Sequence, residues 1–176
     1  MDILSMLQGK LGEGDLLGEI ASSLGLEQRE VEQTAREGLP AMMEGMRRNA
    51  ESGTEGAASL AKALADHARD DVRSVRDVDV DDGRKILGHI FSGSNEPLAQ
   101  KAGIFDQKKG GILSMLAPIL MSALGQKTAE QNVGISDLGS IFGGGSGGGI
   151  LGSLTGFLDK DKDGSIMDDL GDLFKR

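Results

Sequence analysis

The sequence predicts an all-α protein with a multi-helical body, a glycine-rich linker and a short C-terminal helix-loop-helix. Along most of the chain, apolar residues recur at spacings of three and four, which is the period of a helix with one buried face. The alternation of apolar and polar residues that indicates a strand is nearly absent. Eight glycines between Gly139 and Gly152 interrupt the helical pattern, and this composition is typical of a flexible linker. We therefore divide the chain into a helical body over 1–127, a linker over 128–149 and a C-terminal segment over 150–176.

Each helix of the body follows from its own apolar spacing, and several carry a residue that indicates an end. Gly25 is expected to cap the C-terminus of the second helix, because glycine readily takes the left-handed conformation found there. Asp81 or Asp82 is the expected N-terminal cap of the fifth helix, since an aspartate accepts hydrogen bonds from free backbone N–H groups. The methionine stripe over 42–46 is expected to fill an aliphatic core rather than to form a partner surface. The expected helices, in chain order, contain residues 3–11, 16–24, 28–50, 54–65, 86–91, 96–102 and 107–124.

Two parts of the body resemble each other when the sequence is shifted so that Gly25 meets Gly103. In both parts a short helix ends at a glycine, an apolar residue follows, and a longer helix carries an internal proline. Each proline removes a backbone donor and crowds the preceding turn, so we expect a kink in both long helices. The pattern indicates either a common ancestor or a shared packing unit. The identical pairs are Ala21 and Ala99, Gly25 and Gly103, Pro40 and Pro118, and Met43 and Met121.

Composition narrows the classes of function. The chain has no cysteine, which removes disulfides, thiolate metal sites and cysteine nucleophiles and agrees with a cytoplasmic location. Its formal net charge is −9, so a broad surface for nucleic acid or anionic membrane is not expected. The N-terminus lacks a basic segment before an apolar run, so we expect no secretory signal. No apolar stretch reaches the roughly 18 residues of a transmembrane segment, and residues 112–124 are predicted to form a buried helix instead.

Several motifs of the body occur in an order that is found in a known family. The first is Ile-Leu-Gly-His-Ile-Phe-Ser-Gly over 86–93, followed by Leu-Ala at 98–99 and Gly-Ile at 103–104. The last is the apolar run over 113–125, which contains Leu-Ala-Pro at 116–118. Together these motifs resemble the YidB-like family of bacterial all-helical proteins of unknown function, some of which end in a similar glycine-rich and aspartate-rich tail. The resemblance implies a helical fold and a bacterial source, and it transfers no catalytic residues.

The C-terminal segment contains the one stretch whose spacing indicates a specific chemistry. Asp159, Asp161 and Asp163 alternate along the chain, and Gly164 follows them directly. Calcium takes about six to eight oxygen ligands, and a tight loop supplies them from its first, third and fifth positions, with glycine at the sixth for the sharp turn. The segment therefore predicts a calcium loop of the EF-hand or dockerin type.

The second half of this loop departs from the usual pattern. The backbone carbonyl of Ser165 is the next expected ligand, but Leu170 stands at the twelfth position, where a carboxylate normally completes the shell. Asp168 or Asp169 would have to replace that carboxylate, so we expect weak binding, with a dissociation constant of about 10⁻⁴ to 10⁻³ M. The alternative is an acidic, solvated turn whose two lysines partly neutralise it.

Three other patterns suggest a site, and for each of them a structural interpretation is favoured. Residues 77–83 imitate the calcium-loop spacing, but a helix-capping acidic turn explains them better because the glycine comes one residue late. Residues 20–38 match a helix-turn-helix profile. The second helix of that unit has more glutamates than arginines, which suits packing better than contact with phosphates. His67 and His89 have no nucleophile at a fixed spacing, so packed or capping roles are expected.

These patterns favour a non-enzymatic bacterial protein that binds a protein partner or self-associates and carries a weak calcium-binding tail. Calcium is the only cofactor that the sequence suggests. The alternative is a DNA-binding regulator that uses the helix-turn-helix-like unit over 20–38, although nucleic acid is not an expected partner. An enzyme finds no support, because the sequence offers no nucleophile–base pair, no phosphate-binding loop and no histidine-rich metal set.

Overall fold

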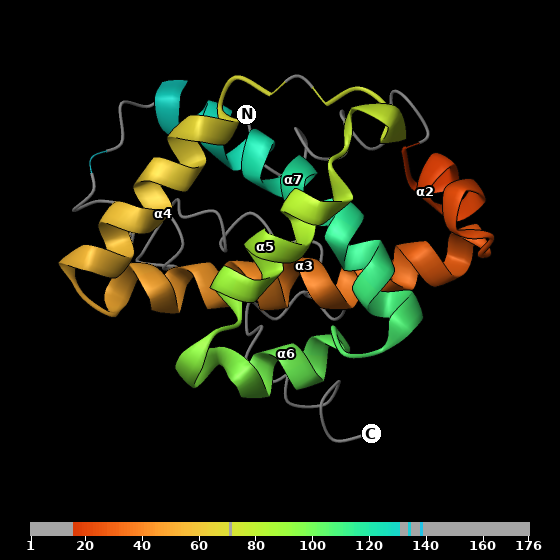
Figure 1. Cartoon of the computed structure of the whole chain (residues 1–176), viewed down its shortest axis with the longest axis horizontal. Helices are drawn as coiled ribbons and strands as arrows, with labels where there is room; N and C mark the ends of the chain where they lie inside the picture. Colours follow the sequence, from red (N-terminus) through yellow and green to blue (C-terminus); the bar gives the residue numbers. More distant parts are fainter. Residues whose placement is uncertain (1–15, 71, 131–133, 135–137, 139–176) are drawn as a thin grey trace, which may run out of the picture.

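A computed structural model describes residues 16–70, 72–130, 134 and 138. These residues form six α-helices and two short 3₁₀ helices without any strand, so the predicted all-α class is confirmed. Figure 1 shows the helices stacked across one another around a shared centre. In chain order the elements are α2 (Leu16–Leu24), α3 (Gln28–Glu51), α4 (Thr54–His67), η1 (Val75–Asp77), α5 (Val80–Ile90), η2 (Gly93–Asn95), α6 (Glu96–Ala102) and α7 (Gln107–Glu130).

The central element is α7. Every residue from Ile112 to Gly125 is buried, and the helix packs against α3, α4 and α5. Figure 1 shows it running obliquely across the middle of the molecule, where α3 and α5 cross it. Among the described helices, α7 is the one long and apolar enough to cross a membrane, and 78% of its most apolar stretch is buried inside the protein. A helix that is apolar all round has to lie in a core or in a membrane, so the prediction of a buried helix over 112–124 is confirmed.

Two glycines let the neighbouring helices approach α7 closely. A Cβ atom added at Gly83 of α5 would lie 1.8 Å from the carbonyl oxygen of Ser114 in α7. A Cβ atom added at Gly125 of α7 would lie 2.2 Å from the carbonyl oxygen of Leu64 in α4. Both distances are far below van der Waals contact, so no side chain fits at either crossing.

Pro118 explains why α5 lies against this part of α7. In a regular helix the carbonyl oxygen of Ser114 would accept a hydrogen bond from the backbone of residue 118, but proline has no N–H. That oxygen faces Gly83 of α5, where an added Cβ atom would also lie 3.2 Å from Cδ of Pro118. The helix α7 continues through Pro118, as α3 does through Pro40, so neither proline interrupts its helix.

The two similar parts of the sequence share their local structure. Both α2 and α6 end at a glycine in the left-handed conformation, with φ of 66° at Gly25 and 72° at Gly103. The residue after each glycine donates its N–H to the carbonyl of an alanine five positions earlier, at 2.9 Å in the first part and 3.1 Å in the second. A helix of 24 residues follows in each. The packing of the two short helices differs. In the first part α2 packs against α3, the long helix that follows it, whereas in the second part α6 packs against α3, the long helix of the other part. The two parts therefore share the capped turn but not a tertiary unit.

The core is aliphatic and rich in methionine, as predicted. Met42, Met43 and Met46 are completely buried, so this stripe fills the core and forms no partner surface. The helix α7 runs beyond the predicted end of the body, and the side chain of Leu138 is also buried in the core. Most of 128–176 lies outside the described residues, and the division into body, linker and tail stays a prediction.

Asn95 connects three helices at the start of α6. Its side chain is buried, and its Nδ2 lies 2.9 Å from the carbonyl oxygen of Ile90, 2.9 Å from Oδ1 of Asn49 and 3.2 Å from the carbonyl oxygen of Gly45. An amide nitrogen carries two hydrogens, so it shares them among these three acceptors. The Oδ1 atom of Asn95 is buried without a partner in the described part of the chain. The amide thus holds the start of α6 to α3 and to the end of α5.

Candidate functional site

The charged turn before α5 contains the acidic residues that imitate a calcium loop. Asp79 is the N-cap of α5, and its Oδ1 accepts hydrogen bonds from the backbone N–H of Asp81 at 2.9 Å and of Asp82 at 3.0 Å. The prediction that Asp81 or Asp82 is the cap was wrong, because the helix already begins at Val80 and both aspartates lie in its first turn. The interpretation of the turn as a helix cap is confirmed. No group of three or more metal-ligating side chains that could hold an ion occurs in the described residues.

His67 ends α4 and lies between two carboxylates. Its Nδ1 is 2.7 Å from Oδ2 of Asp70, and its Nε2 is 3.5 Å from Oδ2 of Asp82. Both ring nitrogens face carboxylates, so the ring links the end of α4 to the start of α5, as expected of a packed histidine. His89 is exposed near the end of α5, where its backbone carbonyl accepts a hydrogen bond from the side chain of Asn49 at 3.1 Å.

The helix-turn-helix-like unit over 20–38 consists of the end of α2, the glycine turn and the first part of α3. Two of its glutamates pair with α7: Glu30 lies 3.3 Å from Nζ of Lys108, and Glu37 lies 2.9 Å from Nζ of Lys109. Burial raises the pKa of Glu37, but the hydrogen bond and charge of Lys109, with a further hydrogen bond, hold it below its ordinary value. The unit therefore packs α3 onto α7, and nothing in the described residues supports DNA binding.

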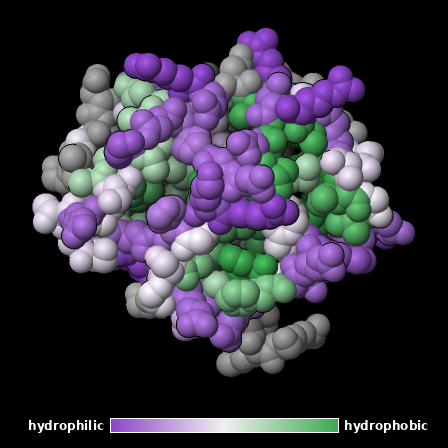
Figure 2. All heavy atoms as spheres, in the orientation of Figure 1, coloured by the Kyte–Doolittle hydropathy of each residue, from purple (hydrophilic) through white to green (hydrophobic). Residues whose placement is uncertain are grey.

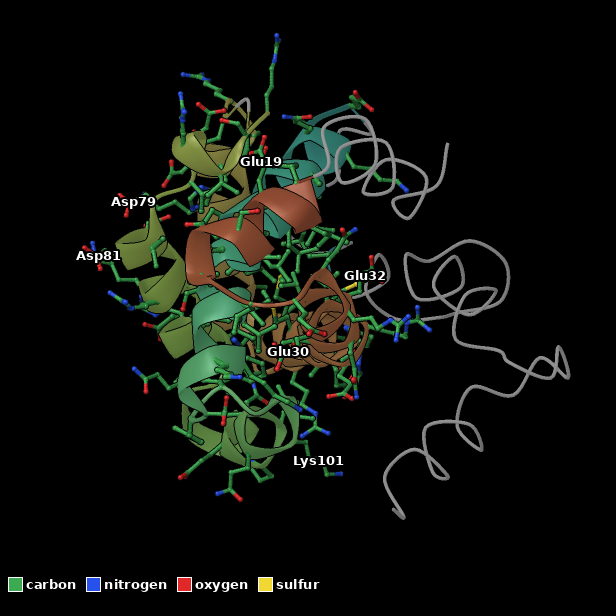
Figure 3. All side chains as sticks on the ribbon, turned by 90° about the vertical axis from the view of Figure 1, so that its right-hand side faces the viewer. Glu19, Glu30, Glu32, Asp79, Asp81 and Lys101 are labelled. Atoms are coloured by element: carbon green, nitrogen blue, oxygen red, sulfur yellow. The ribbon has the colours of Figure 1, made fainter. Side chains whose placement is uncertain are left out.

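Charged side chains are spread over several faces of the molecule. Figure 3 shows Asp79 and Asp81 on one side, Glu32 on the opposite side and Lys101 at the end formed by α6. Figure 2 shows a band of hydrophilic side chains over α5, with hydrophobic side chains reaching the surface on both sides of it. The acidic residues labelled in Figure 3 lie on more than one side of the molecule, so these residues do not gather into one binding site.

Two large hydrophobic side chains are exposed in the described part of the chain. Leu24, at the end of α2, is 37% exposed, and Phe105, in the turn between α6 and α7, is 69% exposed. Both adjoin the start of α7, because Cδ2 of Leu24 lies 3.9 Å from the Cβ position of Gly111 and Phe105 directly precedes Asp106, the residue before α7. Sequence reasoning missed this pair. The available signal is that Phe105 stands two residues after Gly103, the glycine that ends α6, and belongs to no apolar stripe.

An open groove lies between α2 and η1, with a volume of about 810 Å³. Glu19 joins its two walls, since its carboxylate accepts the backbone N–H of Val75 at 2.9 Å. The serines of the groove have no histidine beside them, so the lining supplies no activated nucleophile. The groove is lined by Gly18, Glu19, Ala21, Ser22, Ser23, Leu26, Gln28, Ser74, Val75 and Arg76.

The helical body matches a known family of bacterial proteins. The family model described as "Bacterial protein of unknown function (DUF937)" matches residues 5–128, which is more than half of the chain. The chain belongs to this family. The YidB-like proteins are members of the DUF937 family, so the resemblance seen in the sequence is confirmed for the body. No curated protein and no solved structure matches the chain.

The DUF937 match ends before the aspartate-rich tail, and the structure does not describe that tail. The calcium loop therefore stays a prediction from the sequence alone. The six predicted ligand residues, all outside the described residues, are Asp159, Asp161, Asp163, Ser165, Asp168 and Asp169.

Proposed function

We propose that this DUF937 protein is a non-enzymatic binding module that self-associates, and that its tail binds calcium weakly. The observation that carries the proposal is the exposure of two large hydrophobic side chains, Phe105 in the turn before α7 and Leu24 at the end of α2. Burying a phenylalanine side chain is worth about 1.5–3 kcal/mol, and aromatic residues are enriched where proteins meet. A second copy of the chain offers the same surface, and two-fold dimers in which a patch meets itself are the commonest oligomers.

The charges next to Phe105 suit such a contact. Asp106 directly follows Phe105 in the sequence. Hydrogen bonds from the backbone N–H groups of Lys109 and Lys108 hold the pKa of the Asp106 carboxyl below its ordinary value. The side chain of Lys108 is largely exposed two residues further on. In a two-fold interface the patch of one copy meets the same patch of the other, so a patch that carries both signs of charge is able to complement itself.

The geometry of the polar groups supports a role without catalysis. A nucleophile needs a base within hydrogen-bond reach, and that base needs a free nitrogen or oxygen. His67 turns both ring nitrogens toward Asp70 and Asp82, and no histidine lines the groove between α2 and η1. We therefore base the proposed function on an exposed surface rather than on a catalytic site.

Sedimentation equilibrium of the full chain over a range of concentrations tests the self-association. We expect the wild type to form a dimer, and Phe105→Ser to lower the association constant by about tenfold or more, since tenfold corresponds to about 1.4 kcal/mol. Ala58→Ser, at an exposed position of α4, is the matched control and should leave the constant unchanged. Thermal melting checks that both variants fold. A wild type that stays monomeric, or a Phe105→Ser variant that associates as the wild type does, would refute self-association through this patch.

Calorimetric titration of the full chain with calcium tests the tail. We expect one calcium ion per chain with a dissociation constant of about 10⁻⁴ to 10⁻³ M, and weak competition by magnesium, which holds its waters tightly. Asp161→Asn and Asp163→Asn should abolish the binding heat. Asp81→Asn, in the acidic first turn of α5, is the control and should not change it. Absence of binding heat at calcium concentrations of about a millimolar would leave the tail as an acidic turn, and the dimer experiment would stand independently.

A further inference from the structure

We draw no further inference here: the strongest candidate, the open groove between α2 and η1 that Leu26, Val75 and Arg76 line, carries nothing because no feature of the described residues shows what would occupy it.

Discussion

Replacement of a glycine by alanine should have opposite effects at two positions of the same helix, α5. Gly88 is exposed, and a Cβ atom added there meets nothing within 4 Å. Alanine costs less backbone entropy in a helix than glycine does, so Gly88→Ala should stabilise the protein by about 0.5–1 kcal/mol. Gly83 differs, because its added Cβ atom would lie 1.8 Å from the carbonyl oxygen and 2.8 Å from the carbonyl carbon of Ser114.

The cost at Gly83 follows from how far α5 would have to move. A carbon atom and a carbonyl oxygen approach to about 3.3 Å, so relief of the contact with Ser114 requires a shift of about 1.5 Å away from α7. A gap of about 0.5–1 Å already forfeits a quarter to a half of the dispersion energy between packed atoms. The contacting atoms of Ser114 belong to the backbone of α7, so they cannot move aside by a change of side-chain rotamer. Overpacking of this kind costs about 1–3 kcal/mol, and Gly83→Ala should therefore be destabilising despite its better helix propensity.

Urea unfolding of the full chain, followed by circular dichroism, measures both effects. The two variants should differ in free energy of unfolding by about 1.5–4 kcal/mol, which adds the gain at Gly88 to the loss at Gly83. Equal slopes of free energy against urea concentration would show that the unfolding transitions are comparable. If Gly83→Ala were as stable as Gly88→Ala, α5 and α7 would not meet through this glycine, and the account of the crossing at Pro118 would be wrong.

Two further changes test buried and half-buried polar groups by the same unfolding measurement. Asn95→Asp replaces the donating Nδ2 with an oxygen that faces three acceptors, and an uncompensated buried charge costs about 3–5 kcal/mol; an unchanged urea midpoint would contradict the observed amide position. Glu37→Gln tests the pair with Lys109. The pKa of Glu37 is lower in the folded state than its ordinary value of 4.5, so its stabilisation is present above that pH and is lost as the pH falls. Because both side chains of the pair are partly exposed to solvent, the variant should lose only about 0.2–1 kcal/mol at pH 7 and nothing at a pH below the folded-state value; an equal loss at both would contradict the pairing.

Helix ends governed by local chemistry were predictable from the sequence. Gly25 ends α2 in the left-handed conformation, and α6 spans the predicted residues 96–102, because capping depends on a few adjacent backbone groups. The end of α7 was not predictable in this way. The apolar run stops at Leu124, yet the helix continues to Glu130, since Gly125 packs against the backbone of α4 instead of ending the helix. The cap at Asp79 was missed because the prediction placed the start of this helix by the apolar residues from Ile86 onward, whereas α5 begins at Val80.

The same distinction between local and tertiary causes explains which part of the proposed function could be predicted from the sequence. A calcium loop binds its ion through residues that are close together in the sequence. The spacing of its aspartates therefore predicts the loop without knowledge of the fold. A docking surface depends on which apolar side chains the fold leaves outside. In the sequence Phe105 is one apolar residue among many, and Gly83 cannot be told from Gly88. Only the packing of α5 against α7 makes Gly83 a contact, and only the fold leaves Phe105 exposed in the turn between α6 and α7. The test of self-association therefore begins from Phe105, whereas the test of calcium binding begins from the sequence motif.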